Sequence, residues 1–400
     1  MSQVSITPVF LILIATWMTM SYASKWIKTH TSESRFGSID GLRGYLALFV
    51  FMHHSIIWYF YLNTGKWAVP PSNIYTHFGQ TSVALFFMVT GFLFTNKIIE
   101  NKITPIDWLR VIVSRVLRLT PLYLFAVTIL FIVVTIATKA VLNVTYSKLI
   151  IDCVKWVFFT IPGAPDLNAL KHTTMVVAGV VWTLPFEWFF YLSLPLLAML
   201  QGQIPKARYI IFSAASLYII TRFFSPATIL IIPFFGGIIA AYFARLEICK
   251  KSSKHWISST LATACLVLVV TVYPTAYGYP QYILITIFFI FISSGNDLFG
   301  VLTLKLSRTL GELTYSIYLL HGLVLYISFN LIGYNTATSL STVSYWAFII
   351  FLTPLMLSLS IWTFIYIERP TYSLTSPITK KLRSLLHRLK AYQSKPRITL

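Results

Sequence analysis

Long apolar runs recur along the whole 400-residue chain, and they limit its fold more than any other feature. The composition is 57% hydrophobic and only 10% charged, whereas soluble domains carry about a quarter charged residues. The runs come near the ~20 residues with which a helix crosses a bilayer. The sequence therefore predicts an all-α fold, a polytopic membrane bundle with about 11 transmembrane helices, over residues 5–23, 42–62, 81–98, 119–138, 176–200, 208–222, 226–244, 257–274, 279–294, 313–333 and 343–366.

The basic residues gather in the short segments between these runs, and this pattern orients the chain. A net charge of +20 could suggest a nucleic-acid partner, but clustering between apolar runs is instead the orientation signal of membrane proteins. With the N-terminus outside, 25 of the 31 Lys and Arg residues fall in cytoplasmic segments. We therefore expect an external N-terminus, a cytoplasmic C-terminus and no nucleic-acid partner.

The sequence divides into three parts. Residues 1–38 are predicted to form a transmembrane anchor and linker, uncleaved because the basic residues follow the apolar run instead of preceding it. Residues 39–371 are predicted to be one membrane domain, whose longest external segment, 139–175, is expected to be an irregular loop with short helices. Residues 372–400 form a basic cytoplasmic tail, which either lies against anionic lipid or only contributes to the orientation signal.

Arg43 and His54 are predicted to lie on one face of the helix over residues 42–62. Eleven helical steps turn the chain by about 1100°, so the two side chains nearly eclipse one another, roughly 16 Å apart along the axis. The guanidinium would lie at a membrane edge and the imidazole about halfway across, where ionisable groups are costly and usually functional. This spacing suggests a site that holds an anionic donor at one surface and carries out proton chemistry inside the bilayer.

The neighbouring His53 points about 100° away from His54 and does not share the face of Arg43. For either histidine the alternative is a core residue that is hydrogen-bonded to a backbone carbonyl. A neutral imidazole is the usual general base near neutral pH. We therefore favour His54 over His53 as a catalytic residue.

A second ionisable group, Glu187, falls near the middle of the run over residues 176–200. An unpaired carboxylate at that depth should become neutral or find a partner. Pro185 disturbs the helix just before it, which can free a carbonyl to line a polar cavity, and Thr183 and Tyr191 share its face. Glu187 is therefore either a site residue or the centre of a structural hydrogen-bond network.

A polar stripe runs along the helix predicted over residues 313–333. Thr314, Tyr318 and His321 follow the spacing of one helical face, and such a face should contact protein or water and not lipid. The adjacent Tyr315 is a weaker candidate, because tyrosines are often only interfacial anchors. His321 lies deeper and is harder to explain in that way.

Three arginines, Arg110, Arg115 and Arg118, precede the run over residues 119–138. Guanidinium groups suit bidentate binding of phosphate. The excess of basic residues on the cytoplasmic side would by itself also place them here. They are therefore either an anion site or part of the orientation signal.

Six segments resemble, in order, the motifs of the acyltransferase-3 family of bacterial membrane proteins, which O-acylate cell-surface and secreted glycans. The resemblance extends from Asp40 to Pro370, with threonine in place of serine at Thr90 and Thr183. It implies a ten-helix core, to which this chain adds the span over residues 5–23. The six segments are Arg43-x10-His54, Leu85 to Leu93 (FF-x-x-S-G-F), Arg115 to Tyr123 (R-x-x-R-x-x-P-x-Y), Trp182 to Glu187 (W-S-L-x-x-E), Gly311 to His321 (G-x-x-S-Y-x-x-Y-L-x-H) and Glu368-Arg369-Pro370.

The resemblance implies transfer of an acyl group, most often acetyl from acetyl-CoA, to a hydroxyl of a cell-envelope or exported carbohydrate. By the same resemblance His54 becomes the general base, and Arg43, Arg115 and Arg118 become the donor-binding cluster. Coenzyme A is polyanionic and cytoplasmic, which agrees with a basic cluster at that surface. The implied location is the bacterial inner membrane, with a carbohydrate or glycolipid acceptor and a separate periplasmic partner protein.

Three further residues, Glu187, His321 and Tyr315, complete the predicted catalytic set. Glu187 or a tyrosine hydroxyl could orient His54 or contact the acceptor. The transfer is expected to be direct, although an acyl-histidine or acyl-serine intermediate is an alternative. The cysteines are widely spaced and form no metal-type pattern, so no metal is expected.

Three other functions compete with acetyl transfer. Buried His and Glu residues also serve proton-coupled transporters or flippases for glycans or lipids, but the chain has no internal repeat and its Arg–His spacing favours a thioester donor. A succinyl donor would need an extra cation near His54, and the sequence places none there. A purely structural membrane protein would leave the buried ionisable groups unexplained.

Overall fold

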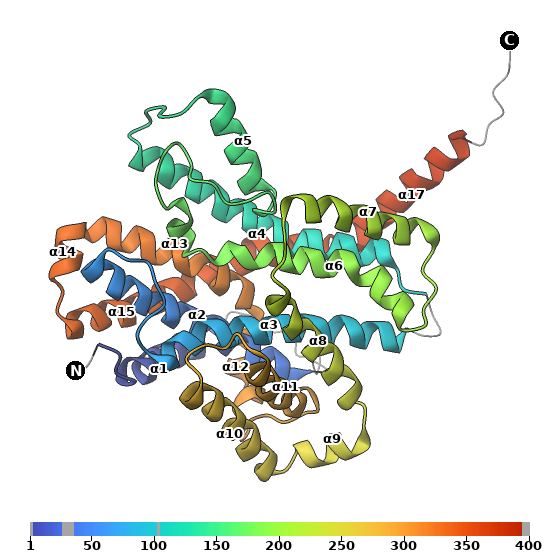
Figure 1. Ribbon diagram of the computed structural model, residues 1–400, viewed down its shortest axis with the longest axis horizontal. Helices are drawn as coiled ribbons and strands as arrows, with labels where there is room; N and C mark the ends of the chain where they lie inside the picture. The colour runs from blue at the N-terminus through green and yellow to red at the C-terminus, as the bar shows by residue number, and fades with distance from the viewer. Residues whose placement is uncertain (1–2, 26–35, 102–104, 394–400) are drawn as a thin grey trace.

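The computed structural model describes residues 3–25, 36–101 and 105–393, and this part of the chain is mostly helical (Figure 1). No strand occurs in these ranges, which confirms the all-α prediction. The longer helices are α1 (Thr7–Ala23), α2 (Gly37–Thr64), α3 (Asn73–Glu100), α4 (Trp108–Ala137), α6 (Thr183–Leu200), α7 (Ala207–Phe223), α8 (Thr228–Phe243), α10 (Trp256–Val272), α11 (Tyr279–Ser293), α13 (Thr314–Ile332), α15 (Thr342–Thr363) and α17 (Thr375–Gln393).

Short helices connect these elements. They are α5 (Tyr146–Val157), α9 (Glu247–Ser253), α12 (Lys305–Glu312), α14 (Tyr334–Ser339) and α16 (Arg369–Ser373), with the 3₁₀ turns η1 (Thr173–Val177), η2 (Val180–Trp182) and η3 (Val301–Thr303) and the π-helical turn η4 (Phe364–Glu368). The predicted linker residues 26–35 and the last tail residues 394–400 lie outside the described ranges.

Each predicted span coincides with a helix, but the helices differ in length. Among the described residues, 6 helices are long and apolar enough to cross a membrane, or 7 if α8 and α9, bent by 99°, form one broken span. Helices α1, α10 and α11 are apolar but only 17, 17 and 15 residues long. The chain is therefore a polytopic membrane helix bundle, and the number of eleven spans stays a prediction.

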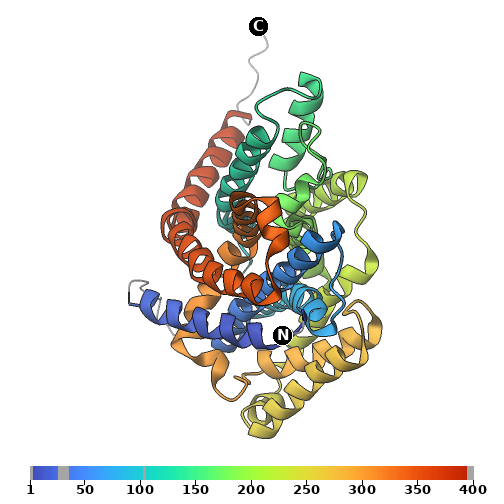
Figure 2. The ribbon, with the colours of Figure 1, turned by 90° about the vertical axis from the view of Figure 1, so that its left-hand side faces the viewer.

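Helices α2 and α3 form the centre of the bundle. Helix α2 packs against α3, α12 and α13, and α3 packs along α8. Helix α1 lies beside α15 at the periphery, while α10 and α11 pair on another side of the molecule (Figures 1 and 2). Helix α2 thus carries Arg43, His53 and His54 in the interior of the bundle, where neighbouring helices surround them.

The crossing of α3 and α8 depends on two glycines. A Cβ atom on Gly91 would lie 2.2 Å from the carbonyl oxygen of Phe234, and one on Gly237 would lie 2.0 Å from that of Met88. Small residues allow membrane helices to approach this closely. The glycine of the Leu85–Leu93 segment therefore has a packing role.

The segment over residues 139–175, predicted to be external, contains helix α5 and folds back along α4 (Figure 1). The hydroxyl of Tyr123 donates a hydrogen bond of 2.5 Å to the carbonyl oxygen of Trp156, and the ring of Phe159 stacks on that of Tyr123 with centroids 4.4 Å apart. Tyr123 lies about halfway along the 30-residue helix α4. The segment thus reaches the middle of the bundle, where Phe159 meets Trp188.

The predicted start of the span over residues 176–200 is wrong. Ala178 and Gly179 have φ angles of 49° and 73°, a left-handed conformation that interrupts an α-helix. The 3₁₀ turns η1 and η2 occupy this stretch, and α6 begins only at Thr183. Turn η1 packs closely on α13, since a Cβ atom on Gly322 would lie 2.3 Å from the carbonyl carbon of Val177.

Candidate active site

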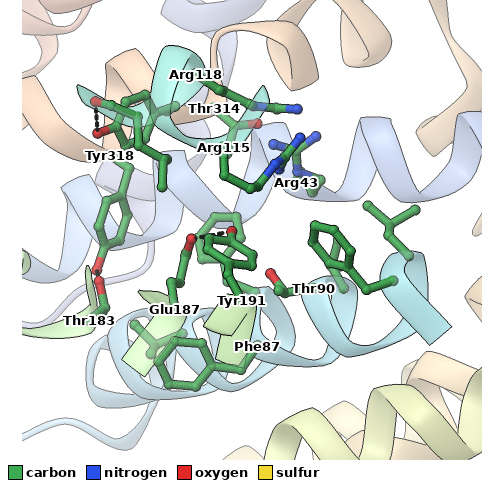
Figure 3. Close-up of a pocket in the computed structure, with 17 residues that line it drawn as sticks. Arg43, Phe87, Thr90, Arg115, Arg118, Thr183, Glu187, Tyr191, Thr314 and Tyr318 are labelled. Carbon is green, nitrogen blue, oxygen red and sulfur yellow. Dashed lines mark hydrogen bonds between the residues drawn. The ribbon is translucent and has the colours of Figure 1, made fainter. Parts of the chain in front are cut away.

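A small cavity lies among α2, α3, α4, α6 and α13 and has a volume of about 100 Å³ (Figure 3). Its walls include cationic, acidic and phenolic groups that are candidate site residues from the sequence. We call it the arginine cavity. The predicted site residues that line it are Arg43, Arg115, Arg118, Glu187 and Tyr315.

The three guanidinium groups of the arginine cavity have different surroundings. The guanidinium carbon of Arg115 lies 5.4 Å from the ring centroid of Phe94 and 5.8 Å from that of Tyr191, in cation–π contact. Arg43 lies 3.7 Å from Asp40, one turn earlier on α2. Within the described part of the chain, Arg115 and Arg118 form no ion pair. Both cations are therefore available to an anion.

Glu187 is the one carboxylate among the residues that line the cavity. It is half-buried, and its Oε2 atom accepts a hydrogen bond of 2.6 Å from the hydroxyl of Tyr191 (Figure 3). Tyr191 therefore contacts both Glu187 and Arg115. Three guanidinium groups face one carboxylate, so the lining carries excess positive charge and suits a negatively charged ligand.

Two tyrosines of α13 form another wall of the arginine cavity. The hydroxyl of Tyr315 donates to the carbonyl oxygen of Leu119 at 2.8 Å, which ties α13 to α4. The hydroxyl of Tyr318 lies 3.0 Å from Oγ1 of Thr183 and 3.2 Å from the carbonyl oxygen of Val180 (Figure 3). Tyr315 is thus engaged structurally, and its predicted catalytic role stays a prediction.

His54 and His321 form a hydrogen-bonded pair beyond this wall, which we call the histidine pair. Nε2 of His321 and Nδ1 of His54 lie 3.1 Å apart. Nδ1 of His321 lies 3.0 Å from the carbonyl oxygen of Ile317, and Nδ1 of His54 lies 3.0 Å from that of Val50. His321 is fully buried and His54 half-buried. The pair connects α2 with α13.

These contacts assign the protons of the histidine pair when both rings are neutral. A carbonyl oxygen only accepts hydrogen bonds, so Nδ1 of His321 carries a hydrogen and its Nε2 is an acceptor. Nδ1 of His54 must then carry the hydrogen that faces both Nε2 of His321 and the Val50 carbonyl. The lone pair of His54 is therefore on Nε2, which is the atom that can act as a base.

The arginine cavity and the histidine pair are neighbours that share Tyr318. This residue lines the cavity, and its ring centroid lies 6.3 Å from that of His321. His54 and His321 do not line the cavity themselves. The polar stripe of Thr314, Tyr318 and His321 is buried against protein, as predicted.

His53 occupies a different environment from His54. Its Nδ1 atom lies 2.7 Å from the carbonyl oxygen of Tyr75, and its side chain is buried. Gly79 lies directly beside it, because a Cβ atom there would come within 2.5 Å of the imidazole ring. His53 thus has the features of a core histidine bonded to a carbonyl.

The site includes contacts that the sequence analysis did not identify. Trp67, from the connection between α2 and α3, stacks beside His54 with ring centroids 6.5 Å apart. The buried Glu368 accepts a hydrogen bond from Ser316, which in turn accepts one of 3.0 Å from Thr363. Glu368 belongs to the Glu368-Arg369-Pro370 segment of the family resemblance, but its bond to Ser316 was not predictable, because the π-helical turn η4 that carries it has no simple sequence signature.

Comparison with protein families matches residues 36–365 to the acyltransferase-3 family, described as an acyltransferase domain. The match includes the whole arginine cavity and the histidine pair. No curated protein and no solved structure matches the chain. Because the match covers most of its length, the chain belongs to the acyltransferase-3 family and is a membrane acyltransferase.

Proposed function

We propose that this protein is a membrane O-acyltransferase that moves an acetyl group from cytoplasmic acetyl-CoA to a hydroxyl of a cell-envelope or exported carbohydrate. The observation that carries the proposal is the histidine pair, because its hydrogen bonds leave Nε2 of His54 free to accept a proton. Membership of an acyltransferase family favours an enzyme over a transporter or flippase.

The arginine cavity supports an anionic acyl donor. Its excess positive charge suits the phosphates of coenzyme A, and Arg115 and Arg118 form no ion pair in the described residues that would compete with them. The volume of about 100 Å³ is small for a ligand site. It suits the narrow thioester arm of the donor, which enters from the end of the bundle where α4 begins.

The proposed reaction is a direct transfer. Nε2 of His54 removes the proton from the acceptor hydroxyl, and the oxygen attacks the thioester carbonyl. The carbon–sulfur bond then breaks, and the thiolate of coenzyme A takes the proton back from the imidazolium. His321 acts as a positioning residue by holding His54 in the reactive tautomer. Positioned base catalysis of this kind contributes roughly 10²–10⁴-fold.

The remaining site residues have supporting roles in this proposal. Glu187 bonds to Tyr191, whose ring contacts Arg115, so the two residues orient a donor-binding guanidinium. Tyr318 lies in the wall between donor and base, and its side chain has to let the thioester pass. No metal takes part in this scheme. The acceptor approaches from the outer face of the bacterial inner membrane, with help from a periplasmic partner protein.

The test compares membranes that contain the wild type or His54→Ala at equal abundance. Each is incubated with radiolabelled acetyl-CoA and the glycan fraction of the host, and alkali-labile label on glycan is counted. Label with the wild type and little with the variant supports the proposal. Equal label with both proteins would show that His54 takes no part in the chemistry. Stoichiometric labelling of the protein in the absence of acceptor would contradict direct transfer.

A further inference from the structure

A second and larger hollow lies at the end of the bundle where α4 begins. Its volume is about 570 Å³, and it lies among the start of α4, the connection from α6 to α7 and the tail helix α17. In Figure 1, the C-terminal end of α3 and this connection lie together at the right-hand end of the bundle. We call it the basic hollow, and the polar residues in its lining are Asp107, Gln203, Lys206, Arg208, Tyr209, Arg383 and His387.

The basic hollow carries excess positive charge from separate elements. Lys206 and Arg208 come from the connection and the first turn of α7, and Arg383 comes from α17. The one carboxylate in the lining, Asp107, pairs with Arg383 at 2.5 Å. Among the described residues, Lys206 and Arg208 form no ion pair. Two cations are therefore left for a negatively charged ligand.

An aromatic ring lies beside these charges. The guanidinium carbon of Arg208 lies 4.8 Å from the ring centroid of Tyr209, and its Nη2 donates to the Tyr209 hydroxyl at 3.1 Å. Tyr209 is itself only half-buried. A flat face next to a guanidinium suits a ligand that combines phosphate with an aromatic base.

The basic hollow and the arginine cavity lie at successive levels of the same two helices. On α3, Phe94 lines the cavity, and the amide of Gln203 in the hollow donates to the carbonyl oxygens of Ile98 and Asn101 at 2.9 and 2.8 Å. On α4, Leu109 lines the hollow and Arg115 lines the cavity, about 9 Å apart along the axis. Along the axes of these helices, the separation is one that an extended ligand can span.

The two sites differ in volume, so each suits a different part of such a ligand. Sites that enclose a compact organic ligand measure roughly 300–1,000 Å³. The arginine cavity, at about 100 Å³, is too small for a nucleotide, whereas the hollow, at about 570 Å³, is large enough. An acyl-CoA has a narrow thioester arm and a bulky nucleotide that carries three phosphates.

We propose that the basic hollow binds the 3′-phosphorylated adenosine end of the acyl-CoA donor, while the pyrophosphate extends to the arginines of the arginine cavity and the thioester arm enters it. This inference rests on the proposed function. Lys206 and Arg208 contact the 3′-phosphate, and the ring of Tyr209 lies against the adenine. The tail helix α17 thereby becomes part of the donor site through Arg383.

The test uses the purified full-length protein in discs of neutral phosphatidylcholine. The double variant Lys206→Gln/Arg208→Gln is compared with the wild type for acetyl-CoA and for acetyl-pantetheine, which lacks the nucleotide. We expect the KM for acetyl-CoA to rise about 10-fold to 100-fold, because charge-assisted contacts to phosphate are lost. The KM for acetyl-pantetheine should not change. The matched control, Lys250→Gln/Lys251→Gln, removes two charges from α9 outside the hollow and should change neither value.

Direct binding separates this inference from the proposed function. Calorimetry with adenosine 3′-phosphate 5′-diphosphate should show binding to the wild type and at least tenfold weaker binding to the double variant. Equal changes with both donors, or no change with either, would overturn the inference. It would also fall if the variant mattered only in discs with anionic lipid, since the hollow would then bind a lipid headgroup. Binding of the nucleotide without transfer from either donor would contradict only the proposed function.

Discussion

In the arginine cavity three guanidinium groups face a single carboxylate, whereas the histidine pair consists of two imidazole rings in one hydrogen-bond chain between α2 and α13. The cavity can attract a ligand through net charge, which tolerates small changes of geometry. The pair can take a proton only at one atom, Nε2 of His54, and only while its ring is held in one orientation. Substitutions in the pair should therefore lower kcat, and substitutions in the cavity should raise the KM of the donor.

The largest effect is expected at His54. Replacing it with Ala removes the general base, and kcat should fall by roughly 10²–10⁴-fold with little change in donor KM. The measurement is transfer of radiolabelled acetyl at matched protein abundance. His53→Gln is the control, because His53 bonds to the Tyr75 carbonyl in the core. If His53→Gln lost as much activity as His54→Ala, the assignment of the base would be wrong.

The next effect concerns the orientation of the base. His321→Phe removes the acceptor for the Nδ1 hydrogen of His54, and kcat should fall about 10-fold to 100-fold, as for other residues that orient a reactive group. His321→Gln retains a side-chain acceptor and should recover part of the loss. Both kcat and the folded fraction should be measured. Equal losses in the two variants would show that His321 has a packing role only.

A smaller effect is expected for donor binding at Arg118. Arg118→Gln removes a cation of the arginine cavity, and the donor KM should rise about tenfold while kcat changes little. Arg118→Lys keeps the charge but not the bidentate geometry, so its donor KM should lie between those of the wild type and Arg118→Gln. Initial rates over a range of acetyl-CoA concentrations test this prediction. A fall in kcat at unchanged KM would remove the distinction between the two regions.

The smallest effect is expected at Tyr191, which connects Glu187 with Arg115. Tyr191→Phe deletes the hydrogen bond to Glu187 but keeps the ring under the guanidinium. A hydrogen bond contributes a net free energy of about 1 kcal/mol, so its loss should weaken donor binding and raise the donor KM about fivefold. Tyr191→Leu also removes the ring and should raise the donor KM further. If both variants bound the donor like the wild type, Glu187 would not act through Arg115.

The sequence was sufficient to single out most of the charged residues of the candidate site individually. Arg43 and His54 were related by helical spacing, and Glu187 was conspicuous as a carboxylate inside an apolar run, because both signals are local. The partners of these residues were not predictable. His54 meets His321 across 267 positions of the chain, and no local pattern encodes such a contact.

The fold could be predicted to a similar extent. Apolar length placed the helices, because a bilayer requires about 20 apolar residues of each. It could not show that the segment after α4 turns back along that helix. This turn uses left-handed backbone at Lys139 and Ala140, residues that rarely adopt it. The basic hollow combines three distant segments and was likewise invisible to sequence patterns.

Tyr318 has an electrical consequence for the cell. A path of water from the arginine cavity to the outer face would carry protons down the membrane potential, and each would dissipate about 2.3 kcal/mol per 100 mV. The ring of Tyr318, held through its hydroxyl to Thr183 and Val180, lies in the cavity wall beside the histidine pair. In the proposed reaction this side chain has to admit the thioester and still block a continuous path of water across the membrane.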